Sequence, residues 1–199
     1  MGTINAVMVK QLREKSGAGI MDCKEALTEC DGDMDKSIEY LRKKGLATAQ
    51  KRAGRSTSEG VVQAYIHLGG KIGVMVEVNC ETDFVAKTDD FQEFSRNIAM
   101  HIAATSPVGI NQEDVPQEIV DRELDIYRAQ AREMGKPEKM IDKIAEGKLS
   151  KFYKDSCLMN QPYVRDPNMT ITDYLNEVIA KTGEKISIKR FARFQIGEA

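Results

Sequence analysis

The sequence of 199 residues contains no tryptophan and few side chains that hold a metal ion. Its only histidines are His67 and His101, and its cysteines form no CxxC pair: they are Cys23, Cys30, Cys80 and Cys157. A zinc site needs several nitrogen and sulfur ligands close together, so this pattern predicts no metal centre. Isolated cysteines of this kind are typical of reduced structural thiols.

Two kinds of catalytic motif are also missing. No G-x-x-x-x-G-K-[ST] phosphate loop occurs, and Gly17–Gly19 lacks both a preceding strand and a following Lys-Ser or Lys-Thr. The histidines have no recognisable serine or cysteine nucleophile motif beside them, and Asp89–Asp90 fits a helix start better than an acid/base pair. We therefore predict a protein that is not an enzyme, needs no cofactor and binds no nucleotide itself.

Long apolar runs are absent as well. No stretch approaches the roughly 18 apolar residues of a membrane helix, and Met1–Asn5 lacks the basic and apolar regions of a signal peptide. We expect a cytoplasmic protein without membrane contact. The net charge is −2, from 29 basic and 31 acidic residues. Dedicated nucleic-acid binders carry a clear basic excess, so the composition favours a protein partner.

A three-helix bundle is predicted over residues 1–50. Gly17–Gly19 and Asp31–Asp33 separate three short segments with apolar residues at helical spacing, and Gly45 fits the end of the third helix. Residues 51–60 then lack any apolar period and predict a linker. Its cations fit a solvated hinge, with RNA contact as the alternative.

Residues 61–110 predict a core sheet and a helix. Strands over 61–66 and 72–78 form a hairpin around Gly69–Lys71. A helix follows over 90–104 and ends before a proline. This region is expected to supply the first part of an antiparallel sheet domain.

An antiparallel helical hairpin is predicted over residues 111–160. Apolar residues recur at the spacing of a coiled-coil seam, at Val120, Leu124, Tyr127, Ala131 and Met134. Gly135–Pro137 provides the stop and the restart between the two arms. Residues 161–199 then contain a helix over 170–181 and a strand over 185–194 that completes the core. The predicted fold class is α+β.

Phe84 is the aromatic residue with the most unusual setting. It follows the polar, turn-prone segment Asn79–Asp83 and precedes a helix that begins near Asp90, so it is predicted at a tip beyond a strand. Its ring is either a plug that turns back into its own core or a wedge that enters a partner's pocket. The residues alone leave both interpretations open.

Two longer strings carry a family resemblance. They are CETDFVA at Cys80–Ala86 and LREKSGAGIMDCKEAL at Leu12–Leu27. Both are similar to signatures of elongation factor Ts, the nucleotide-exchange factor of elongation factor Tu, and the chain resembles that family over nearly its whole length. The resemblance implies a bundle of the ubiquitin-associated type, followed by the sheet domain. It also implies that the protein promotes GDP release from elongation factor Tu.

The resemblance also implies a role for the TDFV motif. Phe84 would enter between helices of elongation factor Tu near the magnesium side of its nucleotide site, and Asp83 would bind at the rim of that pocket. Thr82 and Val85 belong to the same motif. The expected mechanism is an apolar wedge that disturbs the magnesium and phosphate supports of the partner.

Further contacts are implied at four other positions. Arg13, Ile20 and Met21 match family positions that dock on the GTP-binding domain of the partner. Core packing of the bundle is the alternative for the two apolar residues, and simple solvation is the alternative for Arg13. His101 lies in a segment that would touch the phosphate-loop region, and a satisfied histidine beside the core is its alternative.

One half-unit of core is present where longer members of the resembled family carry two. A sheet with an open edge must be paired or covered, which together with the resemblance predicts a two-fold homodimer. The alternative is a monomer in which strand 186–194 pairs back onto residues 61–78 and the helical hairpin covers the edge. The rival function is an RNA- or ribosome-associated adaptor that uses the bundle and the basic linker.

Overall fold

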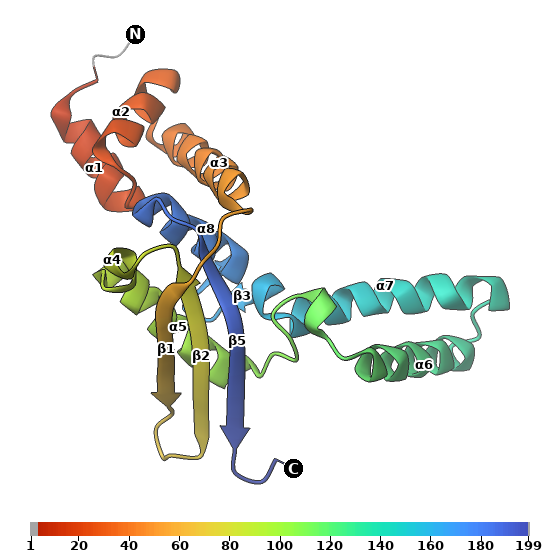
Figure 1. Ribbon diagram of the computed structural model, residues 1–199. Coiled ribbons are helices and arrows are strands. Elements are labelled where there is room, and N and C mark those ends of the chain that lie inside the picture. The colour runs from red at the N-terminus through yellow and green to blue at the C-terminus, as the bar shows by residue number, and fades with distance from the viewer. Residues whose placement is uncertain (1–3, 199) are drawn as a thin grey trace. The chain divides into compact units, whose positions relative to one another are not determined.

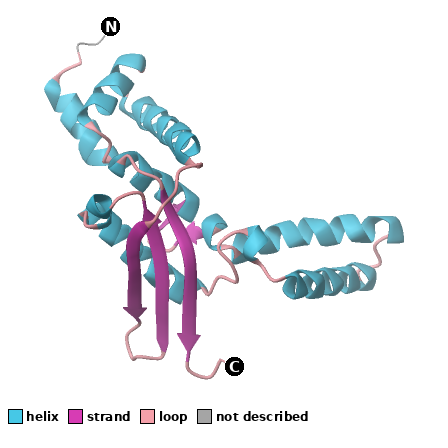
Figure 2. Cartoon of the chain, in the orientation of Figure 1, coloured by secondary structure: helices cyan, strands magenta, loops and turns pink. Residues whose placement is uncertain are grey.

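The computed structural model describes residues 4–198, so residues 1–3 of the predicted bundle and residue 199 lie outside the description. Its helices are α1 Ala6–Ser16, α2 Ile20–Glu29, α3 Met34–Arg52, α4 Asp83–Ala86, α5 Asp89–Thr105, α6 Gln117–Glu133, α7 Glu138–Ser156 and α8 Ile171–Thr182. Its strands are β1 Glu59–Ile66, β2 Ile72–Cys80, β3 Pro162–Tyr163, β4 Asp166–Thr170 and β5 Ile186–Gln195 (Figure 1). The helices are combined with an antiparallel sheet of three strands and a small two-stranded sheet, so the predicted α+β class is confirmed (Figure 2).

The described chain forms two compact units, and each is built from segments that are distant in sequence. The first contains the described residues up to Gln63, together with Val76–Asn97 and Asp173–Lys189. The second contains Ala64–Met75, Ile98–Thr172 and the described residues from Arg190 onward. The predicted motif around Phe84 and the N-terminal bundle therefore lie in the same unit.

The bundle of α1, α2 and α3 has its own small core. Its buried residues come from all three helices: they are Leu12, Cys23, Ala26, Leu27 and Leu41. Asp33 accepts a hydrogen bond from the backbone N–H of Lys36 at 3.0 Å and so caps α3. Gly17 ends α1 with a φ of 66°, a backbone conformation that favours glycine.

The third helix is longer than predicted. Gly45 does not end α3 but lies buried inside it, and the helix continues to Arg52. A Cβ at Gly45 would lie 3.4 Å from the Cβ of Ala180 in α8, so the glycine lies where the two helices approach closely. The predicted stop at Gly45 is therefore wrong, because tertiary packing outweighs the low helix propensity of glycine. The linker is therefore shorter than predicted. It covers residues 53–58, because Arg52 belongs to α3 and Glu59 begins β1.

The main sheet has three strands in the order β1-β2-β5. The backbone N–H of His67 donates to the carbonyl of Ile72 at 2.9 Å and closes the β1–β2 hairpin. β2 buries alternate residues on one face, which are Val74, Val76, Val78 and Cys80. Figure 1 shows β5 beside β2 and pointing the same way as β1. The predicted strands are confirmed, and the pairing of β5 with β2 is the one that the monomer alternative requires.

A second, two-stranded sheet was not predicted. β3 and β4 pair antiparallel, with Pro162 opposite Thr170 and Tyr163 opposite Asp166, and the register shifts between these pairs. The strands are too short and too irregular to produce an alternating apolar pattern. Their place in the second unit matters because they adjoin the buried His101 described below.

The predicted helical hairpin is confirmed as α6 and α7. Val120, Ala131, Ile141 and Ala145 are its buried residues. Met134 departs from the predicted seam, because it ends α6 and its side chain is 67% exposed. Among residues 4–198, no helix combines the length and the apolar character needed to cross a membrane.

Candidate partner-binding site

Phe84 lies on α4, a four-residue helix that begins three residues after β2 ends. Its side chain is 79% exposed, whereas Phe91 and Phe94 on the next helix are fully buried. The predicted polar break over Asn79–Asp83 is therefore partly wrong, since β2 extends to Cys80 and Asp83 already belongs to α4. Phe84 is not a plug for the core of its own chain.

The other residues of the motif have different environments. Thr82 caps α4, because its hydroxyl accepts a hydrogen bond from the backbone N–H of Val85 at 3.4 Å. Val85 is buried and anchors the helix, whereas Asp83 is exposed beside Phe84. The ammonium of Lys87 donates to Asp83 at 2.7 Å, and this hydrogen bond holds the pKa of the Asp83 carboxyl below its usual value. The exposed surface of the motif is thus an aromatic ring beside an anionic carboxylate.

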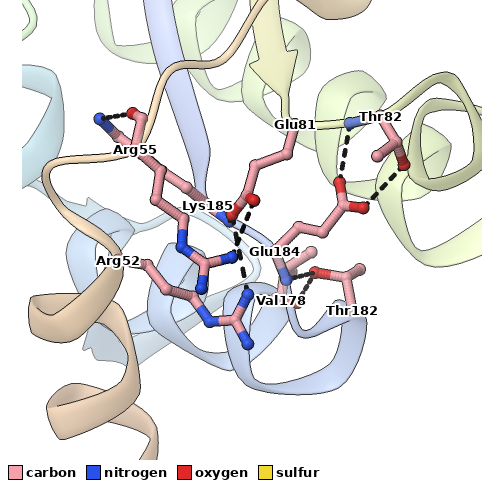
Figure 3. A network of polar contacts seen from close by, with 8 residues as sticks. All are labelled: Arg52, Arg55, Glu81, Thr82, Val178, Thr182, Glu184 and Lys185. Atoms are coloured by element: carbon pink, nitrogen blue, oxygen red, sulfur yellow. Dashed lines mark hydrogen bonds and ion pairs between the residues drawn. The ribbon is translucent and has the colours of Figure 1, made fainter.

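Behind the motif lies a reciprocal pair of contacts, which we call the clasp and define by Glu81, Thr82, Glu184 and Lys185. Glu184 accepts hydrogen bonds from both the backbone N–H of Thr82, at 3.0 Å, and its hydroxyl, at 2.7 Å. Glu81 in turn accepts one from the backbone N–H of Lys185 at 2.7 Å. Figure 3 shows both carboxylates reaching across between the end of β2 and the segment that precedes β5. The pair Glu81 and Thr82 and the pair Glu184 and Lys185 therefore bind each other reciprocally. Each pair supplies one carboxylate and one backbone N–H donor to the other.

The linker is tied to the same clasp. Arg55 donates to Glu81 at 3.0 Å and Arg52 lies 3.7 Å from it, while the ammonium of Lys185 donates to the carbonyls of Ala53 and Arg55 at 2.7 and 2.8 Å. The hydrogen bond from the backbone N–H of Lys185, followed by that from the guanidinium of Arg55, lowers the pKa of the Glu81 carboxyl. Residues 53–58 are mostly exposed to solvent, as predicted, and these contacts hold the segment against the clasp. The RNA alternative depended on Lys51, Arg52 and Arg55, and the two arginines among them are paired with Glu81 within the chain.

The bundle presents a separate apolar surface. Ile20 and Met21 are 55% and 74% exposed, so neither belongs to the core of the bundle. A groove of about 500 Å³ passes over this part of the bundle, and its lining residues are Ile4, Asn5, Ala6, Val9, Lys10, Arg13, Ile20 and Lys24. Three of these side chains are cationic. Two of the three predicted contact residues of the bundle, Arg13 and Ile20, thus share one groove that is lined by apolar and cationic side chains.

His101 belongs to the second unit and has no exposed surface. The backbone N–H of Val164 donates to its Nδ1 at 3.4 Å, and its Nε2 therefore donates to the side-chain oxygen of Gln161 at 2.9 Å. Burial lowers the pKa of the imidazole. Of the two interpretations of His101, the structure has the satisfied histidine beside the core, and not an exposed contact residue.

The sequence reasoning missed Glu81, Glu184 and Lys185. Glu81 lies inside the string that carries the family resemblance and directly precedes the TDFV motif, so its position was a usable signal. No sequence signal pointed to Glu184. It is separated from Thr82 by 102 positions and lies in a polar segment between a predicted helix and a predicted strand. Only the strand order brings the two together.

Known proteins resemble this chain over its full length. A family model described as elongation factor TS matches residues 38–198. The protein named elongation factor Ts from Desulfosudis oleivorans is 68% identical over 198 residues, which cover all of both chains. Its counterpart from Geobacter sulfurreducens is 58% identical over 98% of this chain and 91% of the relative, and that from Moorella thermoacetica is 59% identical over 98% and 96%.

The matches to these relatives cover the bundle, the Phe84 motif and the clasp, whereas the family-model match begins within α3. The chain therefore belongs to the elongation factor Ts family, the guanine-nucleotide exchange factors of translation elongation.

Proposed function

We propose that the protein promotes GDP release from elongation factor Tu by inserting Phe84 as an apolar wedge. Membership of the elongation factor Ts family supports the exchange activity and this partner. The single observation that supports the wedge is the exposed ring of Phe84 on a short, tethered helix. The protein changes how tightly a partner holds its nucleotide and carries out no covalent chemistry itself.

The physical basis is the way in which a GTPase holds its diphosphate. A glycine-rich loop and a magnesium ion kept by mobile switch segments bind the phosphates, so displacing these supports lets the nucleotide leave. Burying the ring of Phe84 in the partner contributes about 1.5–3 kcal/mol, which offsets part of the cost of opening packed structure. Asp83 is exposed beside the ring and supplies a charged hydrogen-bond acceptor at the rim.

The groove of the bundle supplies the second contact of the proposal. Ile20 and Arg13 line it, and Met21 lies next in sequence with an exposed side chain. An apolar floor with the cations Lys10, Arg13 and Lys24 fits an amphipathic, acidic surface of the partner. Two contacts on one compact unit act together at a high effective concentration, so each alone can be weak.

Exchange by this route is reversible. Binding free energies are linked, so a factor that weakens GDP binding a thousandfold, about 4 kcal/mol, is itself weakened equally by GDP. The protein therefore dissociates when nucleotide rebinds, as a catalyst of exchange must.

We include a homodimer in the proposal. In the second unit, five large apolar side chains on and beside the strands are more than half exposed: Ile66, Leu68, Met75, Phe194 and Ile196. The backbone N–H of Ile196 donates to the carbonyl of Lys71 at 3.0 Å, so the end of β5 lies beside the start of β2. Apolar surface of this kind is commonly covered in solution, and a second copy is the expected cover.

Release of fluorescent GDP from elongation factor Tu tests the function directly. The rate of release should rise with the concentration of this protein and reach a plateau. An excess of unlabelled GDP should lower the affinity of the protein for elongation factor Tu, as the linkage requires. A release rate that is unchanged by the protein would overturn the proposal.

A further inference from the structure

The helix that carries Phe84 is too short to be stable alone. α4 has four residues, whereas isolated helices shorter than about 12 residues are marginal in water. Two of its residues, Val85 and Ala86, are buried and hold one side of it. Thr82 fixes the start of α4 as its N-cap. The direction in which Phe84 points therefore depends on Thr82.

Glu184 fixes Thr82 through both of its oxygens. One carboxylate oxygen accepts from the backbone N–H of Thr82 and the other from its hydroxyl. Because that hydroxyl donates to Glu184, a lone pair of the same oxygen is left to accept from the backbone N–H of Val85. Glu184 thus sets the orientation of the side chain that caps α4.

Glu184 is itself held at the end of α8. Gly183 ends that helix with a φ of 72°, and its backbone N–H donates to the carbonyl of Ile179 at 2.9 Å. The backbone N–H of Glu184 faces the hydroxyl of Thr182 at 3.5 Å, and this hydroxyl donates to the carbonyl of Val178 at 2.8 Å (Figure 3). The carboxylate is therefore presented from a fixed helix end.

We propose that Glu184 is a positioning residue for nucleotide exchange, which orients the Phe84 wedge by holding Thr82 at the start of α4. The proposal rests on the function proposed for Phe84. Glu184 is half-buried behind the motif, so it acts through Thr82 and not by touching elongation factor Tu. Orientation matters because a ring that enters a pocket at the wrong angle loses most of its effect on the transition that it promotes.

The test is a double-mutant cycle on the full chain, with release of fluorescent GDP from elongation factor Tu as the readout. The variants are Glu184→Ala, Phe84→Ala and the two combined. Glu184→Ala should lower the rate at saturating protein about tenfold, since it removes two hydrogen bonds to a charged group. The protein concentration that gives half of the maximal rate should change less than about twofold, because the groove of the bundle is unaltered.

A merely structural role would give a different split. Loss of folded protein raises the concentration that gives half of the maximal rate and leaves the saturating rate unchanged. Glu184→Gln keeps the shape but places an amide N–H₂ against a donor of Thr82, so it should show a smaller loss in the saturating rate even if Glu184→Ala folds poorly. Glu93→Ala, which removes an exposed carboxylate from α5 in the same unit, is the matched control and should leave the rate unchanged.

The cycle separates the two proposals. If Glu184 acts only through the ring, Glu184→Ala should add no further loss in the Phe84→Ala background. An equal further loss in that background, or a normal saturating rate for both Glu184 variants, overturns the positioning role. A normal rate for Phe84→Ala would instead overturn the wedge itself.

Discussion

The imidazole of His101 and the side-chain amide of Gln161 form a buried hydrogen bond of 2.9 Å. The hydroxyl of Thr105 donates to the same amide oxygen at 2.9 Å, and the amide nitrogen of Gln161 donates to the carbonyl of Asp155 at 2.8 Å. All three side chains are therefore satisfied while His101 is neutral. A second proton would fall on Nδ1, opposite the backbone N–H of Val164.

The first prediction concerns pH. Burial lowers the pKa of His101 from its ordinary value of 6.5, so the folded state favours the neutral imidazole and the unfolded state binds the proton more readily. The contribution to stability is complete above pH 6.5 and is lost as pH falls from there towards the folded pKa. The free energy of unfolding should therefore fall as the pH is lowered from about 7.5 to about 5.5.

Denaturant titrations of two variants check this assignment. His101→Gln should flatten the pH dependence in this range, and His67→Gln, which alters an exposed histidine, is the matched control. Equal pH dependence in all three proteins would show that another group is responsible.

The second prediction compares two phenylalanines. Phe84→Ala should change the free energy of unfolding by less than about 0.5 kcal/mol, because the ring is exposed, yet slow GDP release. Phe91→Ala removes a fully buried ring and should cost about 3–5 kcal/mol. Thermal melting and the exchange assay on both variants decide the matter. A large stability loss for Phe84→Ala with unchanged exchange per folded molecule would contradict the wedge.

The third prediction tests the surface of the bundle. The double variant Ile20→Ala with Met21→Ala should raise the Kd for nucleotide-free elongation factor Tu about tenfold and leave the melting temperature nearly unchanged, since both side chains are exposed. Leu27→Ala, in the core of the bundle, should instead lower the melting temperature clearly. Calorimetric titration gives the affinities. An unaltered Kd for the double variant would exclude this surface as a contact.

The fourth prediction concerns the linker. Glu81→Ala removes the acceptor of Arg55 and of the backbone N–H of Lys185, so the segment around Arg55 should open more often. Trypsin should then cut after Arg52 or Arg55 about tenfold faster than in the unaltered protein. Mass spectrometry of a digestion time course locates the cuts, and Glu93→Ala serves as the control. Equal cutting rates would mean that the linker is held by other contacts.

The fifth prediction is a concentration-dependent dimer. Sedimentation equilibrium at micromolar concentration should give the mass of two chains, and Phe194→Glu should give the mass of one. The substitution places a charge on apolar surface that a second copy would bury. A single-chain mass for the unaltered protein at every concentration would contradict the proposed dimer.

Much of the fold was predictable because its signals are local. The alternation of Val74, Val76 and Val78 gave β2, and the seam from Val120 to Ala131 gave the first arm of the hairpin. The end of α3 was not predictable in this way. In the sequence, Gly45 predicts the end of a helix. The helix continues through it because the glycine packs closely against Ala180 of α8, which is remote in sequence.

The residues of the candidate site also differ in how far they could be predicted from local sequence. Phe84 and Asp83 were found from a contiguous motif, and the groove residues Arg13 and Ile20 from another. His101 was placed with them because its segment also resembles the family. A polar residue among apolar ones does not indicate whether its hydrogen-bond partners lie within the same chain or in another protein. Glu184 was missed because its partner is remote in sequence.

The separation of 102 positions between Thr82 and Glu184 also sets an order of events during folding. The small core of the bundle is made by buried residues between Leu12 and Leu41, so it can form before the rest of the chain has been synthesised. The clasp must wait until residue 184 has been made and a long loop has closed, which makes it a late step. In pulse-labelling hydrogen exchange, the amide of Leu27 should therefore become protected before that of Thr82, and the helix that presents Phe84 should be among the last parts of the molecule to take shape.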